Sequence, residues 1–216
     1  MKSNSELQKE VQDAIKWEPL LNAAEIGVTV KDGVVSLTGI VDTYAKKIAA
    51  EHAARSVHGV RAVIEEIKVD FPSSWTKSNI EITDEVLKAL AANKSLIDNK
   101  IHVKVEEAWV SLEGEVPWNY QKESAKHVVS HLPGVRGVTN NIKIKPSSNE
   151  IIDQKGIEDA ISRSWSMDDA AIKVKVSGTG VTLSGTVHSL YEKQEAEAIA
   201  WKTPGIWKVD NELIVT

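Results

Sequence analysis

His127 and His131 are the two residues whose type and spacing best suit metal chemistry. They stand four positions apart in a segment of helical periodicity, a spacing that can present two imidazoles to one metal ion. No third ligand is evident in the sequence, and two histidines alone are a weak signal. A solvated helix face is therefore the preferred interpretation, and the sequence predicts no metal site and no other cofactor.

Motifs of catalysis are not found elsewhere in the sequence. There is no G-x-S-x-G motif, no phosphate-binding P-loop and no Ser/His/Asp grouping. Residues 134–137 spell the G-x-x-G of one class of RNA-binding loop, but the match occurs in one copy and is interpreted as chance. A formal net charge of -5 also argues against nucleic-acid binding. We therefore predict no catalytic residues, no enzymatic activity and no nucleic-acid partner.

Aromatic and basic side chains are the better candidates for binding. The seven tryptophans are the least expected feature of the composition. An indole ring is favoured at a membrane interface, and Lys or Arg can meet anionic lipid headgroups. The candidate contact residues are Trp109, Trp118, Lys47, Lys122, Lys193, Arg55 and Arg61. For the lysines, the preferred alternative is a solvated helix face, with Glu51 as the i+4 partner of Lys47.

The elements that position these residues belong to one module that occurs three times. The motif V-x-L-x-G-x-V begins at Val35, Val110 and Val181, so the copies are offset by 75 and then by 71 residues. This period exceeds the length of about 20 to 50 residues that is typical of solenoid repeats. Three small domains are therefore predicted, at residues 3–71, 78–146 and 148–216.

Each copy has the pattern of a helix, a hairpin, a second helix and a last strand. Apolar residues at i, i+4, i+7 and i+8 from Leu7 form one face of the first helix, and strict alternation follows in residues 26–30. The predicted fold class is α+β, with three tandem α-β-β-α-β modules. Each module is expected to be a three-stranded mixed sheet covered on one face by two helices.

Conserved spacing also marks the ends of the helices and one point in the hairpin. Capping boxes start the first helix at Ser3/Glu6 and Ser78/Glu81, and the third copy has its best box two residues out of phase, at Ser147/Glu150. Close approach of neighbouring backbone is predicted at the hairpin glycines Gly39, Gly114 and Gly185. A left-handed conformation is predicted after the second helix at Gly59, Gly134 and Gly205. A bulge is predicted in the last strand at Glu65, Asn140 and Asn211.

The tryptophans do not follow the repeat. Core positions such as Leu37 are identical in all three copies, whereas Trp17 is replaced by Ala92 and Arg163. Packing between copies is the preferred interpretation of the set, followed by contact with a partner or lipid surface and by partial burial at the rim of each core. Trp109 and Trp118 are the best candidates for external contact, because they flank one strand of the least acidic copy.

The combination of these motifs resembles the BON domain family of bacteria. V-x-L-x-G-x-V lies in each hairpin, and G-V-x-x-V or its variant precedes each last strand, at residues 59–63, 134–138 and 205–209. The resemblance covers about residues 5–216. It implies a non-enzymatic module, associated with osmotic and envelope stress, that contacts phospholipid surfaces or other envelope components. It also implies that the shared glycines have structural roles.

The leading hypothesis is a binding or scaffold protein that meets a phospholipid membrane or an envelope or stress protein through surfaces outside the repeated cores. No apolar run approaches the ~20 residues of a membrane-spanning helix, and residues 1–6 lead into an amphipathic pattern. A cytoplasmic protein, peripheral at the inner membrane, is therefore predicted. Two alternatives stay open: a holdase-like stress protein with exposed apolar groups, and a sensor that binds a small ligand or ion between copies.

Overall fold

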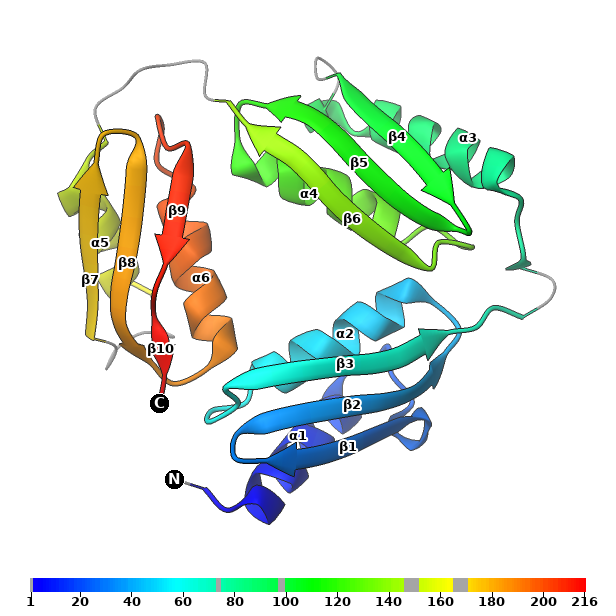
Figure 1. The fold of residues 1–216 in the computed structure, drawn as a ribbon, viewed down its shortest axis with the longest axis horizontal. Helices are drawn as coiled ribbons and strands as arrows, with labels where there is room; N and C mark the ends of the chain where they lie inside the picture. The colour runs from blue at the N-terminus through cyan, green and yellow to red at the C-terminus, as the bar shows by residue number, and fades with distance from the viewer. Residues whose placement is uncertain (1, 73–74, 97–99, 146–151, 165–170) are drawn as a thin grey trace. The chain divides into compact units, whose positions relative to one another are not determined.

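The computed structural model describes residues 2–72, 75–96, 100–145, 152–164 and 171–216 (Figure 1). The chain divides into two compact units. One unit contains the third copy and most of the first, and the other contains the second copy together with residues 40–47. The box predicted at Ser147 and Glu150 lies outside the described residues.

The first copy has the predicted order of elements. They are α1 (Asn4–Trp17), η1 (Ala23–Glu25), β1 (Ile26–Lys31), β2 (Val34–Val41), α2 (Tyr44–Arg55) and β3 (Ala62–Val69). The hairpin strands β1 and β2 are antiparallel, from Ile26 opposite Gly39 to Lys31 opposite Val34. The strand β3 follows β2 in parallel, because Arg61 N donates to Gly33 O and Asp70 N donates to Val41 O at the two ends. The sheet is therefore mixed.

The second copy repeats this topology. Its elements are α3 (Asn79–Ala92), η3 (Lys94–Leu96), β4 (Ile101–Glu106), β5 (Trp109–Val116), α4 (Asn119–Ser130) and β6 (Gly137–Ile144). The central strand β5 is antiparallel to β4 and parallel to β6.

The third copy has a shorter first helix and a divided last strand. Its elements are α5 (Gln154–Ser162), β7 (Ala171–Ser177), β8 (Gly180–Val187), α6 (Leu190–Ala200), β9 (Lys208–Asn211) and β10 (Ile214–Val215). The helix α5 begins after Asp153, whose carboxylate accepts from Gly156 N at 3.0 Å. Both β9 and β10 run parallel to β8.

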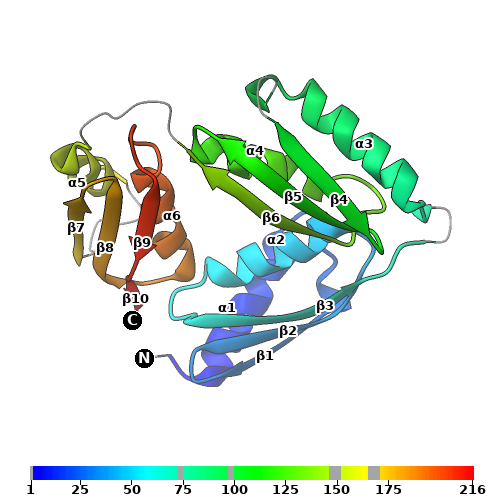
Figure 2. The same ribbon diagram turned by 45° about the horizontal axis from the view of Figure 1, so that its top comes forward.

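The core of each copy lies between one sheet face and its two helices (Figures 1 and 2). The predicted apolar face of the first helix is buried, at Leu7, Val11 and Ile15 in α1 and at Ile82, Val86 and Leu90 in α3. The repeated leucine of the central strand is fully buried in every copy, at Leu37, Leu112 and Leu183. The predicted α+β fold class is confirmed, because each copy is a mixed sheet covered by two helices.

The hairpin glycines lie where a side chain has no room. Gly39 and Gly114 have φ angles of +139° and +140°. A Cβ built on Gly39 would overlap the carbonyl oxygen of Glu25, and one on Gly114 would overlap the carbonyl oxygen of Lys100. The backbone that enters the first hairpin strand therefore occupies the space of the missing side chain. The glycines after the second helices have positive φ as well: Gly59, Gly134 and Gly205.

The predicted bulge in the last strand is wrong for the second and third copies. Asn140 lies opposite Leu112 and the register continues unbroken to the end of β6. In the third copy, Asn211 lies opposite Leu183 and Ile214 lies opposite Thr186, so no residue is inserted. The asparagine amide satisfies backbone groups instead: Asn140 Nδ2 donates to the carbonyl oxygen of Lys122 at 2.8 Å, and its Oδ1 accepts from Ile142 N at 3.3 Å.

The two capping boxes provide a prediction for acid solution. The backbone N–H of Ser3 donates to the Glu6 carboxylate at 2.8 Å, and Ser78 does the same for Glu81. These bonds, followed by those from the serine hydroxyls, lower the pKa of Glu6 and Glu81 below the usual glutamate value. A carboxylate with a lowered pKa stabilises the folded state above its unfolded pKa, and this contribution is lost as the pH falls through the folded pKa.

NMR titration of the side-chain carboxyl groups measures this effect. Glu6 and Glu81 are expected to titrate below the other solvent-exposed glutamates. Ser78→Ala removes the hydroxyl bond and keeps the backbone bond, so it should raise the pKa of Glu81 part of the way while Glu6 is unchanged. A Glu81 titration that does not respond to Ser78→Ala would contradict the contribution assigned to the Ser78 hydroxyl.

Candidate functional site

The first helix of the second copy carries apolar side chains on two of its faces. One face is the buried one already described. The other is an outer stripe formed by Ile80, Leu87 and Ala91, at i, i+7 and i+11, which places the three residues on one line along the helix. Ile80 is 79% exposed and Leu87 is 47% exposed, and Ala91 is also exposed. We call Ile80, Leu87 and Ala91 the α3 stripe.

The sister copies show that the fold does not require this stripe. The same positions in α1 are Ser5, Gln12 and Lys16, which are all exposed. In α5, the positions of Leu87 and Ala91 are taken by Glu158 and Ser162, also exposed. The third-copy position of Ile80 is Ile151, which lies outside the described residues. Isolated exposed apolar residues need no explanation, but a line of them that α1 replaces entirely with polar residues indicates a contact surface.

The charged groups beside the α3 stripe are already paired. Lys77 contacts Glu85 at 2.6 Å, and Lys88 lies 3.7 Å from Asp84. Each of these lysines is therefore balanced by a carboxylate of α3. The stripe is an apolar surface with a neutral border rather than a basic one.

Trp109 lies on the outer face of the second sheet and is 46% exposed. Its ring covers Gly137 of the neighbouring strand so closely that a Cβ on Gly137 would overlap the indole. Its Nε1 donates to Thr139 Oγ1 at 2.8 Å. The indole is therefore held against the sheet, beside a cavity of about 570 Å³ that Lys104, Glu106 and Ser111 help to line. The G-x-x-G at residues 134–137 is explained by this packing and by the end of α4.

The other tryptophans have mixed environments. Trp118 precedes α4 and is half-buried. Trp201 is half-buried against the core of its own copy. Trp17, the last residue of α1, is 84% exposed, so the expectation of packing between copies is wrong for this residue. Trp75 and Trp207 are also exposed, and Trp165 lies outside the described residues.

The three repeated lysines lie at the junction between the second helix and the last strand. Lys47, Lys122 and Lys193 are all half-buried. Lys193 Nζ donates to the carbonyl oxygen of Leu213 at 2.7 Å, and the carbonyl oxygens of Lys122 and Lys193 accept from Asn140 and Asn211. These contacts favour a structural role for the repeated position. The Lys193 ammonium is therefore engaged by a backbone carbonyl of its own domain.

The two candidate arginines also make contacts within the protein. Arg55 pairs with Glu51 at 2.6 Å in α2, so Glu51 is engaged by a residue other than the one predicted. The side chain of Arg61 lies over Gly33 in the hairpin turn. In the second copy, the equivalent Arg136 lies over the ring of Phe71, 5.7 Å from its centroid. The Arg55 guanidinium is thus already paired, and the Arg61 side chain packs against the hairpin turn.

His127 and His131 are adjacent, with ring centroids 4.4 Å apart. His131 Nδ1 lies 2.8 Å from the carbonyl oxygen of His127 in the preceding turn. Among the described residues, no group of three His, Asp or Glu side chains has a geometry that could hold a metal ion.

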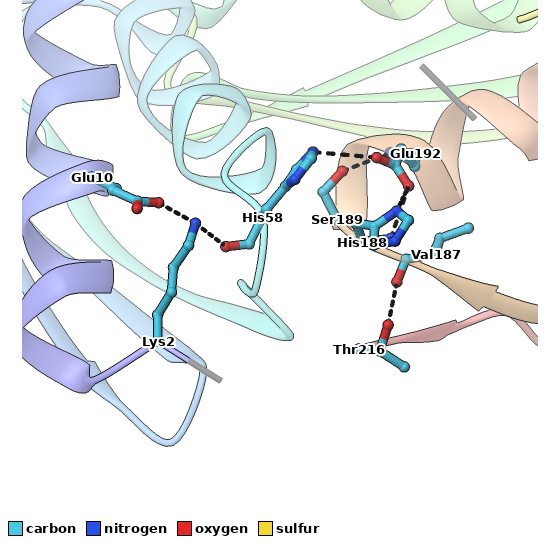
Figure 3. Close-up of polar contacts among 8 residues, drawn as sticks. All are labelled: Lys2, Glu10, His58, Val187, His188, Ser189, Glu192 and Thr216. Carbon is cyan, nitrogen blue, oxygen red and sulfur yellow. Dashed lines mark hydrogen bonds and ion pairs between the residues drawn. The ribbon is translucent and has the colours of Figure 1, made fainter. Parts of the chain in front are cut away.

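A polar cluster joins the first and third copies, and the sequence patterns did not point to it (Figure 3). The backbone N–H of Gly59 donates to the carbonyl oxygen of His188 at 3.0 Å. His58 Nε2 lies 3.4 Å from Glu192 Oε1, and His188 Nδ1 lies 3.3 Å from Glu192 Oε2. We call His58, His188 and Glu192 the junction triad.

Comparison with known protein families identifies the class of this protein. The BON domain family matches residues 3–70, 79–146 and 153–216. The matches cover most of the chain, which therefore belongs to the BON domain family, and the resemblance drawn from the motifs is confirmed. The exact domain limits given by the repeat stay a prediction.

Among individual proteins, the chain is similar to osmotically-inducible protein Y of Escherichia coli (strain K12). The two are 25% identical over 146 residues, which are 66% of this chain and 73% of the relative. A solved structure of CdsD, a structural protein of the type III secretion system of Chlamydia trachomatis, aligns over 98% of this chain and 92% of its own, with 14% identity and a TM-score of 0.26. The PrgH periplasmic domain aligns over 89% and 95%, with 10% identity and a TM-score of 0.24. Similarity at these scores carries no argument about function.

The described part of the chain contains no candidate for a membrane-spanning helix. None of its helices is both long enough and apolar enough to span a membrane.

Proposed function

We propose that this protein is a non-enzymatic binding protein that docks on phospholipid surfaces through the α3 stripe of its second BON domain. The observation that carries this proposal is the exposure of Ile80 and Leu87 on a helix whose counterpart in the first copy has Ser5 and Gln12 at the same positions. A helix that is apolar on one outer line and polar beside it can lie in the interfacial plane of a membrane. The stripe is short, so binding of a single chain is expected to be weak and reversible.

The chemistry of the stripe determines the kind of membrane that it would prefer. Lys77 and Lys88 are paired with carboxylates of the same helix. Attraction to anionic headgroups is therefore expected to contribute little, and apolar burial should supply most of the affinity. Binding should be similar on neutral and anionic vesicles and should depend little on salt.

Vesicle co-sedimentation tests this proposal. The protein is expected to sediment with both phosphatidylcholine vesicles and vesicles that contain phosphatidylglycerol, at low and at moderate salt. Failure to bind either kind of vesicle at low salt would remove the lipid function.

A protein partner is a second candidate function, and Trp109 favours it. Indole rings are enriched where proteins bind one another, and this ring is exposed but held in place by Thr139. Such a ring loses little side-chain entropy on binding. Trp109→Ala is expected to leave vesicle binding unchanged, because the ring belongs to the outer sheet face rather than to α3.

We also propose a cellular role and a location for this binding protein. The similarity to osmotically-inducible protein Y supports a role in the response to osmotic stress. A location at the inner face of the cytoplasmic membrane is proposed with it. Cell fractionation before and after a rise in osmolarity tests both points, through the amount of protein and the fraction that sediments with the membrane.

A further inference from the structure

The junction triad centres on a carboxylate that is almost completely buried. The side chain of Glu192 is 4% exposed. Its Oε2 accepts from the backbone N–H of His188 at 2.8 Å, and its own backbone N–H donates to Ser189 Oγ at 3.1 Å. The carboxylate is thus fixed at the start of α6. His58 of the first copy lies beside its Oε1, and His188 of the third copy lies beside its Oε2. A buried carboxylate is costly unless positive charge or hydrogen bonds compensate it.

Comparison of the three copies shows that the BON fold does not need this charge. Gln121 takes the position of Glu192 in the second copy, where it is also buried and accepts from the backbone N–H of Trp118 at 3.2 Å. An amide therefore performs the capping role without a charge. The positions of both histidines also differ, with Pro133 and Pro204 in place of His58, and Pro117 and Asp42 in place of His188. The ionisable triad occurs only where the first and third copies meet.

Several other charged or titratable groups surround the triad. Lys2 Nζ donates to the carbonyl oxygen of His58 at 3.2 Å and pairs with Glu10 (Figure 3). His52 places its ring edge-on to Tyr191, with centroids 5.6 Å apart. Burial, and then the hydrogen bond to Glu195, raise the pKa of Tyr191, so its phenol stays neutral at physiological pH. Histidine is the side chain that ordinarily changes charge between about pH 5 and 8, which leaves the imidazoles as the groups that can respond in this range.

We propose that the junction triad is a proton-controlled latch between the first and third BON domains. A protonated imidazole supplies a positive charge that compensates the buried Glu192 carboxylate. Because His58 belongs to the first domain and Glu192 to the third, this ion pair holds the two domains together. The rings of His58 and His188 stack with centroids 5.7 Å apart, so two positive charges there would repel each other. The proposed latch therefore uses one protonated imidazole at a time.

The direction of the response follows from proton linkage. The contact between a protonated His58 and the Glu192 carboxylate exists only in the closed state, so loss of the proton at higher pH removes a contact that stabilises this state and shifts the equilibrium towards the open state. A fully exposed ion pair changes such an equilibrium by about two- to five-fold, and we take this range as a lower bound because the Glu192 carboxylate is buried. We therefore expect the ratio of closed to open molecules to fall about three-fold or more between pH 6 and pH 8.

Distance measurement between two spin labels tests the latch in the full chain. The sequence contains no cysteine, so Lys9→Cys and Lys175→Cys introduce one labelling site in each domain at exposed positions. Pulsed electron resonance at pH 6 and at pH 8 gives the distance distribution, in which a narrow component reports the closed junction. The narrow component should dominate at the lower pH and lose population at the higher one.

Two variants identify the source of the response. Glu192→Gln copies the second domain at this position, so it should preserve the α6 cap and the melting temperature but remove the change between pH 6 and pH 8. His131→Gln is the matched control, because it removes an exposed histidine outside the junction and should leave the change intact. An identical distribution at both pH values in the parent, or a response that persists in Glu192→Gln, would overturn the proposal.

Discussion

Replacing Gly114 by alanine should unfold the second domain or come close to doing so. The residue has a φ of +140°, and the added Cβ would overlap the carbonyl oxygen of Lys100. Both the left-handed backbone and the overlap with rigid backbone oppose the change, so a loss of about 3 kcal/mol or more is expected. A small domain of this size has only about 3–5 kcal/mol to lose. Calorimetry and the dispersion of NMR signals from residues 79–146 would measure the effect.

Gly178 provides a matched control for this prediction. It also has a positive φ, +58°, but no atom lies within 4 Å of the position that a Cβ would take. Gly178→Ala should therefore cost only about 1 kcal/mol, the conformational part of the effect. Equal losses in the two variants would show that the backbone contact at Gly114 is not what excludes a side chain.

The double variant Ile80→Ser and Leu87→Gln should lose most of its binding to vesicles. The two substitutions introduce the residues that α1 carries at the equivalent positions, Ser5 and Gln12, so the helix should still fold. Burial of one large aliphatic side chain contributes about 1.5–3 kcal/mol, and the pair is partly exposed in the free protein, so a loss of about 3 kcal/mol is expected. This corresponds to about 100-fold weaker partitioning in co-sedimentation.

A control variant separates the stripe from general surface hydrophobicity. Ile214 is a large exposed aliphatic residue of the third sheet, outside α3. Ile214→Ser should leave vesicle binding within about two-fold of the parent, since one distant side chain contributes to no shared surface. A loss similar to that of the double variant would mean that exposed apolar residues promote vesicle binding wherever they lie on the protein surface.

The fold could be predicted from the sequence because the three copies repeat the same constraints. Alternation, helical periodicity and identical core residues such as Leu37, Leu112 and Leu183 indicated the elements before their packing was known. The predicted bulge at Asn140 failed for a local reason. An amide on the buried side can donate to the Lys122 carbonyl oxygen and accept from Ile142 N, so the strand needs no extra residue.

The candidate site was less predictable, because exposure depends on packing. Trp109 was predicted to be available for external contact, and its ring is exposed, but its packing over Gly137 depends on the strand register, which the sequence does not show. The sequence shows that Ile80 of the α3 stripe replaces Ser5 of the first copy. Whether Ile80 is exposed depends on which face of the helix the core covers, and this required the structure. The junction triad joins residues far apart in the sequence, so no local pattern could reveal it.

NMR of the full chain with nanodiscs that contain a spin-labelled phosphatidylcholine measures directly which surface meets the bilayer. Docking through the α3 stripe predicts that the signals of Ile80, Leu87 and Ala91 lose the most intensity. The equivalent residues of α1, Ser5 and Gln12, should lose much less. Equal losses in the two helices, or the largest loss at a surface outside α3, would contradict docking through the second domain.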